Sequence, residues 1–158
     1  MKLTNLVYVF NDLWQILLCT KKKTNSGFTV SLGKRNGAGG KVDNGESIVG
    51  SAIRELAEET WIFAQENDLK HMWIIHFSFE TQKDRDQECH VYAIDNYTWN
   101  FIETEEMQPQ RWNIKDIPYE NMRSDDKYWM PRMLKWEFVE YKFYFNDSGE
   151  IINYQVIQ

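Results

Sequence analysis

A glycine-rich loop that leads into an acidic helix, over residues 40–62, constrains this chain more than any other feature of its sequence. Adjacent Gly39 and Gly40 allow the backbone to approach a ligand closely, because glycine carries no side chain. Apolar residues then recur at helical spacing, at Val49, Ala52, Ile53 and Leu56. This periodicity predicts an amphipathic helix over residues 47–59, with Ser47 as its N-cap.

Three carboxylates of this helix, on Glu55, Glu58 and Glu59, share one patch, because residues three and four apart are neighbours on a helix surface. Like charges at this spacing repel one another, and Arg54 offsets only one of them. The patch is either a solvated acidic face, which is common, or a site for a hard cation such as Mg²⁺. The spacing alone favours the solvated face. The preceding glycines favour the metal, because a backbone carbonyl there would complete its coordination shell.

The composition limits the partners of the chain. Its 158 residues carry a net charge of −6, so a surface for nucleic-acid polymers is not expected. An acidic protein can still bind phosphates when a divalent cation mediates. Aromatic residues make up 15%, and their side chains are suited to pockets for flat ligands. Two cysteines without metal spacing, no long apolar run and no signal-peptide pattern predict a cytoplasmic protein with no membrane partner.

Most of the remaining chain predicts β-structure. Six strands are expected, over residues 3–10, 15–20, 73–79, 90–94, 139–145 and 151–156. Residues 125–136 predict a second helix, which Pro131 would delay or kink. Loops are expected around Gly27 and Gly33, over residues 36–41 and over the acidic residues 103–109. Together these elements predict one α+β domain over residues 1–158, with a mixed β-sheet sandwiched between helices.

The glycine-rich loop and acidic helix resemble the signature of the Nudix hydrolases, in which a loop, a helix and a second loop hold divalent cations against a diphosphate. The matching positions are Gly40, Glu46, Arg54, Glu55, Leu56, Glu58, Glu59 and Ile62. The pattern has a glycine where this chain has Trp61. That glycine ends the helix. A tryptophan there would cost about 1–2 kcal/mol if the left-handed conformation is kept, or the turn must be rebuilt. We expect a local repacking that leaves the acids in place.

The likeness extends over residues 6–156 and is greatest to the oxidised-purine nucleoside triphosphatases, the 8-oxo-dGTP diphosphatases of that family. It rests on the aromatic stretch with an Asp/Gly turn near the C-terminus and on four runs: Asn36-Gly37-x-Gly39-Gly40-Lys41-Val42, Glu106-Met107-x-Pro109, Ile117-Pro118-Tyr119 and Asp125-Asp126-x-Tyr128-Trp129-x-Pro131. The resemblance implies the Nudix fold and a monomeric enzyme that sanitises the nucleotide pool. Its reaction would be Mg²⁺-dependent hydrolysis of an oxidised purine nucleoside triphosphate to the monophosphate and pyrophosphate, with Mn²⁺ as another usable ion.

The resemblance also assigns roles to individual residues. Metal ligands would be Glu55, Glu58, Glu59 and Glu106, with the backbone of Gly39 and Gly40. Either Glu55 or Glu59 would be the general base, and Arg54 would orient a carboxylate. Lys21 would lie near the phosphates. The purine edge would be read by Asn36, Asp125 and Asp126, between walls formed by Phe77, Phe79 and Trp129.

Adjacent Asp125 and Asp126 have chemistry that suits this role. Two carboxyl groups in an apolar pocket cannot easily both ionise, so the pKa of one should rise. The protonated carboxyl would donate a hydrogen bond to a purine oxygen while its neighbour accepts one. Without the resemblance, both acids would be interpreted as first-turn residues of a helix capped by Ser124.

Three departures from the family leave alternatives open. Besides Trp61, Ala38 stands where this branch has an aromatic residue, and Arg123 stands where it has a base-stacking tryptophan. Arg123 could stack by its guanidinium plane or leave a wider pocket. The alternatives are a Nudix pyrophosphatase acting on a dinucleoside polyphosphate or a nucleotide sugar, and a non-catalytic nucleotide-binding domain.

Overall fold

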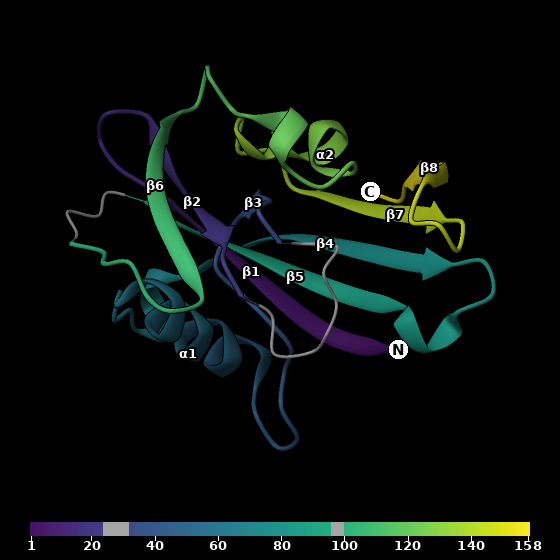
Figure 1. The fold of residues 1–158 in the computed structure, drawn as a ribbon, viewed down its shortest axis with the longest axis horizontal. Helices are drawn as coiled ribbons and strands as arrows, with labels where there is room; N and C mark the ends of the chain where they lie inside the picture. Colours follow the sequence, from purple (N-terminus) through teal and green to yellow (C-terminus); the bar gives the residue numbers. More distant parts are fainter. Residues whose placement is uncertain (24–31, 96–99) are drawn as a thin grey trace.

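An eight-stranded mixed β-sheet lies between two α-helices in residues 1–23, 32–95 and 100–158, which the computed structural model describes (Figure 1). The strands are β1 (Lys2–Phe10), β2 (Gln15–Lys21), β3 (Arg35–Asn36), β4 (Lys70–Phe79), β5 (Gln87–Ile94), β6 (Met107–Asn113), β7 (Val139–Phe145) and β8 (Ile151–Val156). The α-helices are α1 (Ile48–Thr60) and α2 (Asp126–Met133). Short 3-10 helices occur at η2 (Glu66–Asp68), η3 (Lys83–Arg85) and η4 (Tyr119–Asn121). The expected α+β class is confirmed.

The strand order is β3-β2-β1-β5-β4-β7-β8, and β6 pairs with β2 beside this path. Strand β1 runs parallel to β5, and β4 runs parallel to β7. The other pairings are antiparallel. Strand β1 is therefore an interior strand, flanked by β2 and β5, and its side chains reach both faces of the sheet.

Each helix covers one face of the sheet, and β1 alternates between them with the two-residue period of a strand. Val7 and Val9 pack in one cluster with Ala52 and Leu56 of α1. Tyr8 belongs to the other cluster, where its ring lies 5.9 Å from that of Trp129 in α2. Figure 1 shows α1 and α2 on opposite sides of the strands. Two separate apolar layers therefore hold the two helices in place.

Helix α1 begins as predicted, since the Ser47 side chain accepts a hydrogen bond from the Gly50 N–H at 3.0 Å. It ends at Trp61, whose φ of 61° is left-handed, and the Trp61 N–H donates to the Ala57 carbonyl at 2.9 Å. The chain thus keeps the helix end that the family builds with glycine. Because this conformation is strained for any residue with a side chain, Trp61 carries the cost expected from the sequence.

Helix α2 is shorter than predicted. It begins at Asp126, so Pro131 lies inside it and does not delay its start. It ends at Met133, and Trp136 takes a left-handed conformation with φ of 58°. The N-cap position is held by Asp125, so the alternative in which Ser124 caps this helix is wrong.

Two expected loops contain strands. Strand β6 pairs along the whole length of β2, although part of it falls in the predicted loop 103–109. The prediction was wrong because Pro109 and the polar neighbours hide an alternation in which Met107 and Pro109 are buried. Asn36 likewise lies in the short strand β3. The loop expected around Gly27 lies outside the described residues.

The cysteines take no part in a disulfide. Cys19 and Cys89 are both buried and unpaired, and they belong to the two different apolar layers. None of the described helices is long and apolar enough to cross a membrane.

Candidate active site

The glycine-rich loop lies flat against β1. The Val7 N–H donates to the Ala38 carbonyl at 2.7 Å, and the Asn5 N–H donates to the Gly40 carbonyl at 2.9 Å. A Cβ on Gly39 would lie 2.1 Å from the Asn5 carbonyl oxygen. No side chain fits at that distance, so glycine is required for the loop to approach the strand.

The same loop meets the carboxylates of α1. A Cβ on Gly40 would lie 2.4 Å from Glu55 Oε1, so the missing side chain leaves room for that carboxylate. The Gly39 N–H donates to Glu59 Oε2 at 2.9 Å. The buried Ser51 hydroxyl fixes the loop and helix together by donating to the Lys41 carbonyl at 3.1 Å. Two adjacent glycines therefore place backbone groups directly against two of the predicted acids.

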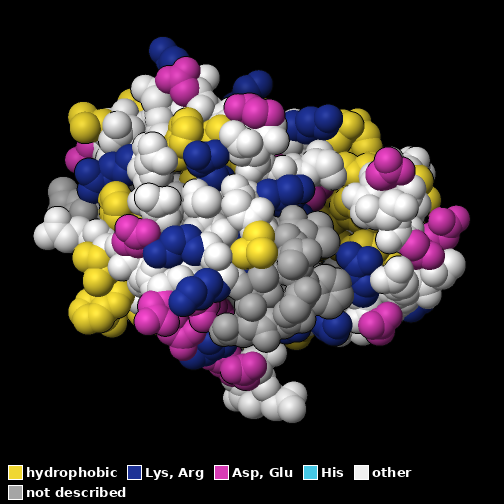
Figure 2. Space-filling view, viewed as in Figure 1, with side chains coloured by type: hydrophobic (Ala, Val, Ile, Leu, Met, Phe, Trp, Pro, Cys, Tyr) yellow, Lys and Arg dark blue, Asp and Glu magenta, His cyan; other side chains and the backbone are white. Residues whose placement is uncertain are grey.

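Arg54 organises the acids on the outer side of this cluster. Its guanidinium forms a paired contact with Glu46, with N–O distances of 2.9 and 3.0 Å. It also donates to Glu55 at 2.9 Å and to Glu58 at 3.3 Å. Because of these contacts, the pKa of Glu46 is lowered to about 2. The structure thus places Arg54 where it orients several carboxylates, and Figure 2 shows acidic and basic side chains gathered over α1.

The carboxylates on the inner side of the cluster are crowded. Glu59 is only 4% exposed, and burial raises its pKa to about 8, aided by the negative charges of Glu55 and Glu106. Burial also raises the pKa of Glu55, together with the charges of Glu58 and Glu106, against the opposing effect of Arg54. Each ionised group therefore makes ionisation of the others more costly, and a bound cation would relieve that repulsion.

Strand pairing brings two further predicted residues to this cluster. Lys21, at the end of β2, pairs with Met107 at the start of β6, which follows Glu106 directly. The positive charge of Lys21 acts on Glu59 in the direction that lowers its pKa. Lys21 and Glu106 thus join the acids of α1, although neither is near them in the sequence.

The donor set suits a hard divalent cation, but its members are not arranged as a finished shell. Among the described residues, no three Asp, Glu, His or Cys side chains converge closely enough to hold a metal ion. Glu55 and Glu58 are turned toward Arg54, and Glu59 is turned toward the Gly39 N–H. Mg²⁺ and Mn²⁺ nevertheless require oxygen donors, and these carboxylates, which repel one another, supply them. They lie beside Gly39 and Gly40, which have no side chains. The chemistry of these residues therefore fits the metal.

A second polar group, formed by Asp125 and Asp126, lies buried at the start of α2. Both side chains belong to residues only 1% exposed. Asp125 accepts from Arg123 Nε at 3.0 Å through one oxygen and from Trp129 Nε1 at 3.1 Å through the other. Asp126 accepts from the Arg123 backbone N–H at 2.9 Å, and its Oδ1 atom has no partner among the described residues. Burial and the charge of Asp125 raise the pKa of Asp126 well above its ordinary value.

Asn36 is connected to this pair through Tyr8. The Tyr8 hydroxyl donates to Asn36 Oδ1 at 2.6 Å, and the Gly37 N–H donates to the same oxygen at 2.8 Å. The charge of Asp126 helps to raise the pKa of Tyr8, although burial contributes most. Tyr8 therefore fixes the amide of Asn36 with its oxygen occupied by two donors.

The three predicted aromatic walls do not have equal access to a ligand. Phe77 and Phe79 are each 6% exposed and are covered by the guanidinium groups of Arg123 and Arg85, at 4.6 and 4.2 Å from the ring centroids. Trp129 is completely buried, with its indole N–H bonded to Asp125. Trp129 therefore supports the aspartate, while Arg123 occupies the outer face of Phe77.

The predicted site residues thus form two groups, one of acids on α1 and one around the aspartate pair. The sequence does not distinguish Tyr8 from the other residues of its strand, because the neighbouring residues are also apolar. The alternation of β1, which puts Tyr8 and Phe10 on one face, is the signal that could have found it. Arg123 is identified as a departure from the family, but its pairing with Asp125 depends on the folded chain.

The fold and the acidic loop–helix define a protein of the Nudix class, and comparison with known proteins agrees. The chain belongs to the NUDIX domain family, whose model matches residues 2–136. An oxidized purine nucleoside triphosphate hydrolase of Danio rerio is 36% identical over 156 residues, covering 98% of this chain and 94% of the relative. The protein of the same name from Mus musculus is 34% identical over 143 residues, covering 90% and 86%.

A solved structure of a MutT protein from Bacillus halodurans shares the fold. It matches with a TM-score of 0.80 at 17% sequence identity, over 99% of this chain and 98% of its own. At that identity the likeness shows the arrangement of the chain and nothing about its substrate.

Proposed function

We propose that this protein hydrolyses oxidised purine nucleoside triphosphates, such as 8-oxo-dGTP, to the monophosphate and pyrophosphate. Water would attack phosphorus at the α–β bridge, and the reaction would remove damaged nucleotides from the pool. The observation that carries the proposal is the meeting of Gly39 and Gly40 with Glu55 and Glu59. The names of the two relatives supply the substrate class.

The phosphate-cleaving half of the site rests on the acids of α1. Mg²⁺ or Mn²⁺ would be held by Glu55, Glu58, Glu59 and Glu106 with the Gly39 and Gly40 backbone. When bound, the ion would screen the phosphate charge and acidify the attacking water. Arg54 keeps two of these carboxylates in place, and Lys21 offers a positive charge to the phosphates. Either Glu55 or Glu59 would accept the proton of the water, since both carboxylates adjoin the glycine loop.

The base-recognising half rests on the aspartate pair. Arg123 and Trp129 each donate to one oxygen of Asp125, so both oxygens of that residue already accept a hydrogen bond. Asp126 would then hold the proton and present Oδ1 as a donor, since that atom has no partner among the described residues. A carbonyl oxygen at purine position 6 accepts such a hydrogen bond, whereas an amino group there does not. We therefore propose a preference for guanine-type over adenine-type oxidised purines.

The proposal also covers the surroundings of the reaction. The net charge of −6 and the buried, unpaired cysteines support a monomer in a reducing cytoplasm that acts on small nucleotides. Residues 1–158 would act as one domain, without a nucleic-acid polymer or a membrane as partner. Retention of the left-handed helix end by Trp61 supports an intact catalytic helix over a non-catalytic domain.

A turnover screen tests the proposal. The protein is incubated with Mg²⁺ and 8-oxo-dGTP, 2-hydroxy-dATP, dGTP or ADP-ribose, and the products are separated by chromatography. We expect 8-oxo-dGTP to give the highest kcat/KM, with release of pyrophosphate. Faster cleavage of ADP-ribose would identify a different Nudix pyrophosphatase, and no turnover of any nucleotide would favour a binding domain.

A further inference from the structure

A cavity of about 400 Å³ opens at the C-terminal end of β1, and none of the predicted site residues lines it. Phe10, which lines it, lies three residues along β1 from Val7 and five from Asn5, the two strand residues whose backbone contacts the glycine loop. Those separations are about 10 and 17 Å in an extended strand. The lining contains none of the acids of α1 and neither member of the aspartate pair. The cavity is therefore a separate feature of the fold.

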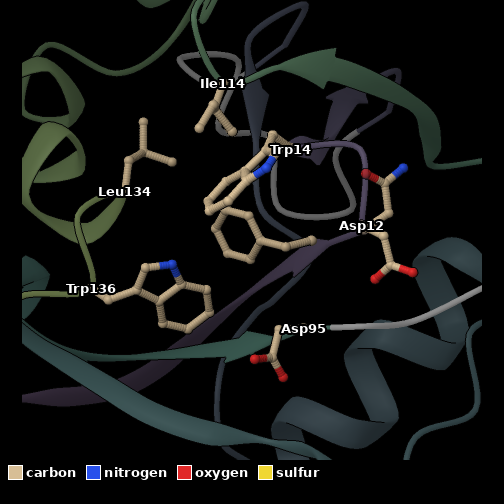
Figure 3. Close-up of a pocket in the computed structure, with 8 residues that line it drawn as sticks. Asp12, Trp14, Asp95, Ile114, Leu134 and Trp136 are labelled. Atoms are coloured by element: carbon tan, nitrogen blue, oxygen red, sulfur yellow. The ribbon is translucent and has the colours of Figure 1, made fainter.

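Its lining combines aromatic rings with negative charge. Phe10, Trp14 and Trp136 supply the rings, and Asp12 and Asp95 supply two carboxylates. Figure 3 shows the indoles of Trp14 and Trp136 on one side and the carboxylates of Asp12 and Asp95 on the other. No lysine or arginine lines the cavity in the described part of the chain. This combination is suited to an organic cation, because ring faces and carboxylates both attract positive charge.

The chain already places an ammonium at one edge of this cavity. Lys70 Nζ lies 2.7 Å from Asp95 Oδ2 and 5.6 Å from the centroid of the Trp136 ring. The Lys70 side chain is 54% exposed, so this ammonium approaches from solvent. Asp12 has no cationic partner among the described residues. Asp12 and the Trp14 ring are therefore open to a second positive group, which would share Asp95 and the Trp136 ring with Lys70.

Backbone strain marks the same two tryptophans. Trp14 and Trp136 have φ values of 57° and 58°, a conformation that costs free energy for any residue with a side chain. Residues held in this way cluster at ligand-binding positions, where the surrounding structure imposes them. Trp14 is also 66% exposed, so an occupant of the cavity would remove apolar surface from water.

We propose that this cavity binds an organic cation of the quaternary or alkylated ammonium class. The positive centre would lie between the carboxylates of Asp12 and Asp95, with its methyl groups against Trp14 and Trp136. Lys70 would compete for Asp95 and for the Trp136 ring. The site is independent of nucleotide hydrolysis.

Titration with choline tests the proposal on the full chain, followed through the indole N–H signals in ¹⁵N NMR spectra. Mg²⁺ is kept in excess to occupy the acids of α1. The matched control ligand is 3,3-dimethyl-1-butanol, which has the shape of choline without its charge. We expect saturable binding of choline, about tenfold tighter than binding of the alcohol. No saturable binding, or equal binding of the alcohol, would overturn the proposal.

Three variants locate the binding. Trp14→Gly removes a ring and relieves strain, so it should fold well and bind choline about tenfold more weakly. Trp61→Gly relieves the same strain away from the cavity and should bind like the parent protein. Lys70→Gln removes the internal competitor and should bind more tightly, an outcome that partial unfolding cannot imitate. Unchanged affinity in Trp14→Gly together with unchanged affinity in Lys70→Gln would place choline elsewhere and reject the site.

Discussion

The two halves of the candidate active site are built in opposite ways. Apart from Glu106 and Lys21, the phosphate-cleaving half comes from one continuous segment, residues 39–59, and it reaches solvent at Glu58, whose side chain is 59% exposed. The aspartate pair is almost completely buried and depends on contacts between α2, β1 and β3. Carboxylates whose charge a bound metal would balance tolerate water. Groups that would distinguish one base from another need burial, because in a buried site one neighbouring charge determines which group holds a proton.

Loss of turnover in Glu58→Gln is the largest effect that this comparison predicts. We expect kcat/KM to fall by about 10²–10³-fold, because the variant loses a charge that would stabilise the transition state through the metal. The Glu58 carboxylate contacts Arg54 at 3.3 Å from an exposed position, so the free energy of unfolding should change by less than about 0.5 kcal/mol. Steady-state kinetics with Mg²⁺ and urea denaturation measure the two quantities.

Glu66→Gln is the matched control for this variant, because Glu66 is an exposed acid in η2, just after α1. It should keep the kinetics of the parent protein. Unfolding of Glu58→Gln would make Glu58 structural, whereas undiminished turnover would remove it from the metal-binding set.

The buried half predicts an effect on stability instead. Folding raises the pKa of Asp126 above its ordinary value of 3.8, so the folded chain binds the extra proton. The free energy of unfolding therefore decreases as pH rises from about 4 toward the raised pKa, by up to about 1.4 kcal/mol per pH unit. Asp126→Asn cannot ionise and should lose this part of the pH dependence.

Urea denaturation between pH 4 and pH 8 measures the difference between the two proteins. As pH rises, the free energy of unfolding of Asp126→Asn should increase relative to that of the parent protein. Asp116→Asn, which alters an exposed aspartate, controls for a general effect of charge. Parallel curves for Asp126→Asn and the parent protein would show that Asp126 is ionised throughout this range.

The same contrast explains what the sequence can predict. Helix α1 and its Ser47 cap follow from local periodicity and from a family pattern that lies in one segment. The left-handed conformation of Trp61 does not follow from them, because a rebuilt turn was equally compatible with the pattern. Strand β6 was not predicted, because its pairing with β2 is set by distant residues while Pro109 reads as a loop. Local patterns determine which residues form a helix, but long-range pairing determines which edge of a sheet receives a polar strand.

The aspartate pair shows a second limit of the same kind. Two adjacent acids predict that one pKa rises, but not which one. The choice depends on Arg123 and Trp129, whose donors reach opposite oxygens of Asp125 only in the folded chain. The sequence therefore predicts that one of the two carboxyl groups has a raised pKa, and packing determines which one it is.

Arg123→Met tests, through the choice of substrate, whether Arg123 determines which aspartate holds the proton. Without the guanidinium, either aspartate would hold the proton, so guanine-type and adenine-type purines would be accepted more equally. We expect the ratio of kcat/KM for 8-oxo-dGTP to that for 2-hydroxy-dATP to fall about tenfold. Arg85→Met is the matched control, since Arg85 covers Phe79 much as Arg123 covers Phe77. An equal loss on both substrates would assign Arg123 to packing rather than to base selection.

The smallest effect concerns Trp61, the position at the end of α1 that departs from the family pattern. Trp61→Gly should raise the free energy of unfolding by about 1 kcal/mol relative to Trp61→Ala, because only glycine relieves the left-handed strain. Urea denaturation of both variants measures this difference, and both lose the same contact with the Phe63 ring. Turnover should change little in either, because the helix end already has the family's conformation. A large gain in kcat for Trp61→Gly alone would show that backbone strain at Trp61 alters the positions of the acids of α1. The two halves of the site would then differ less in rigidity than the difference in their burial implies.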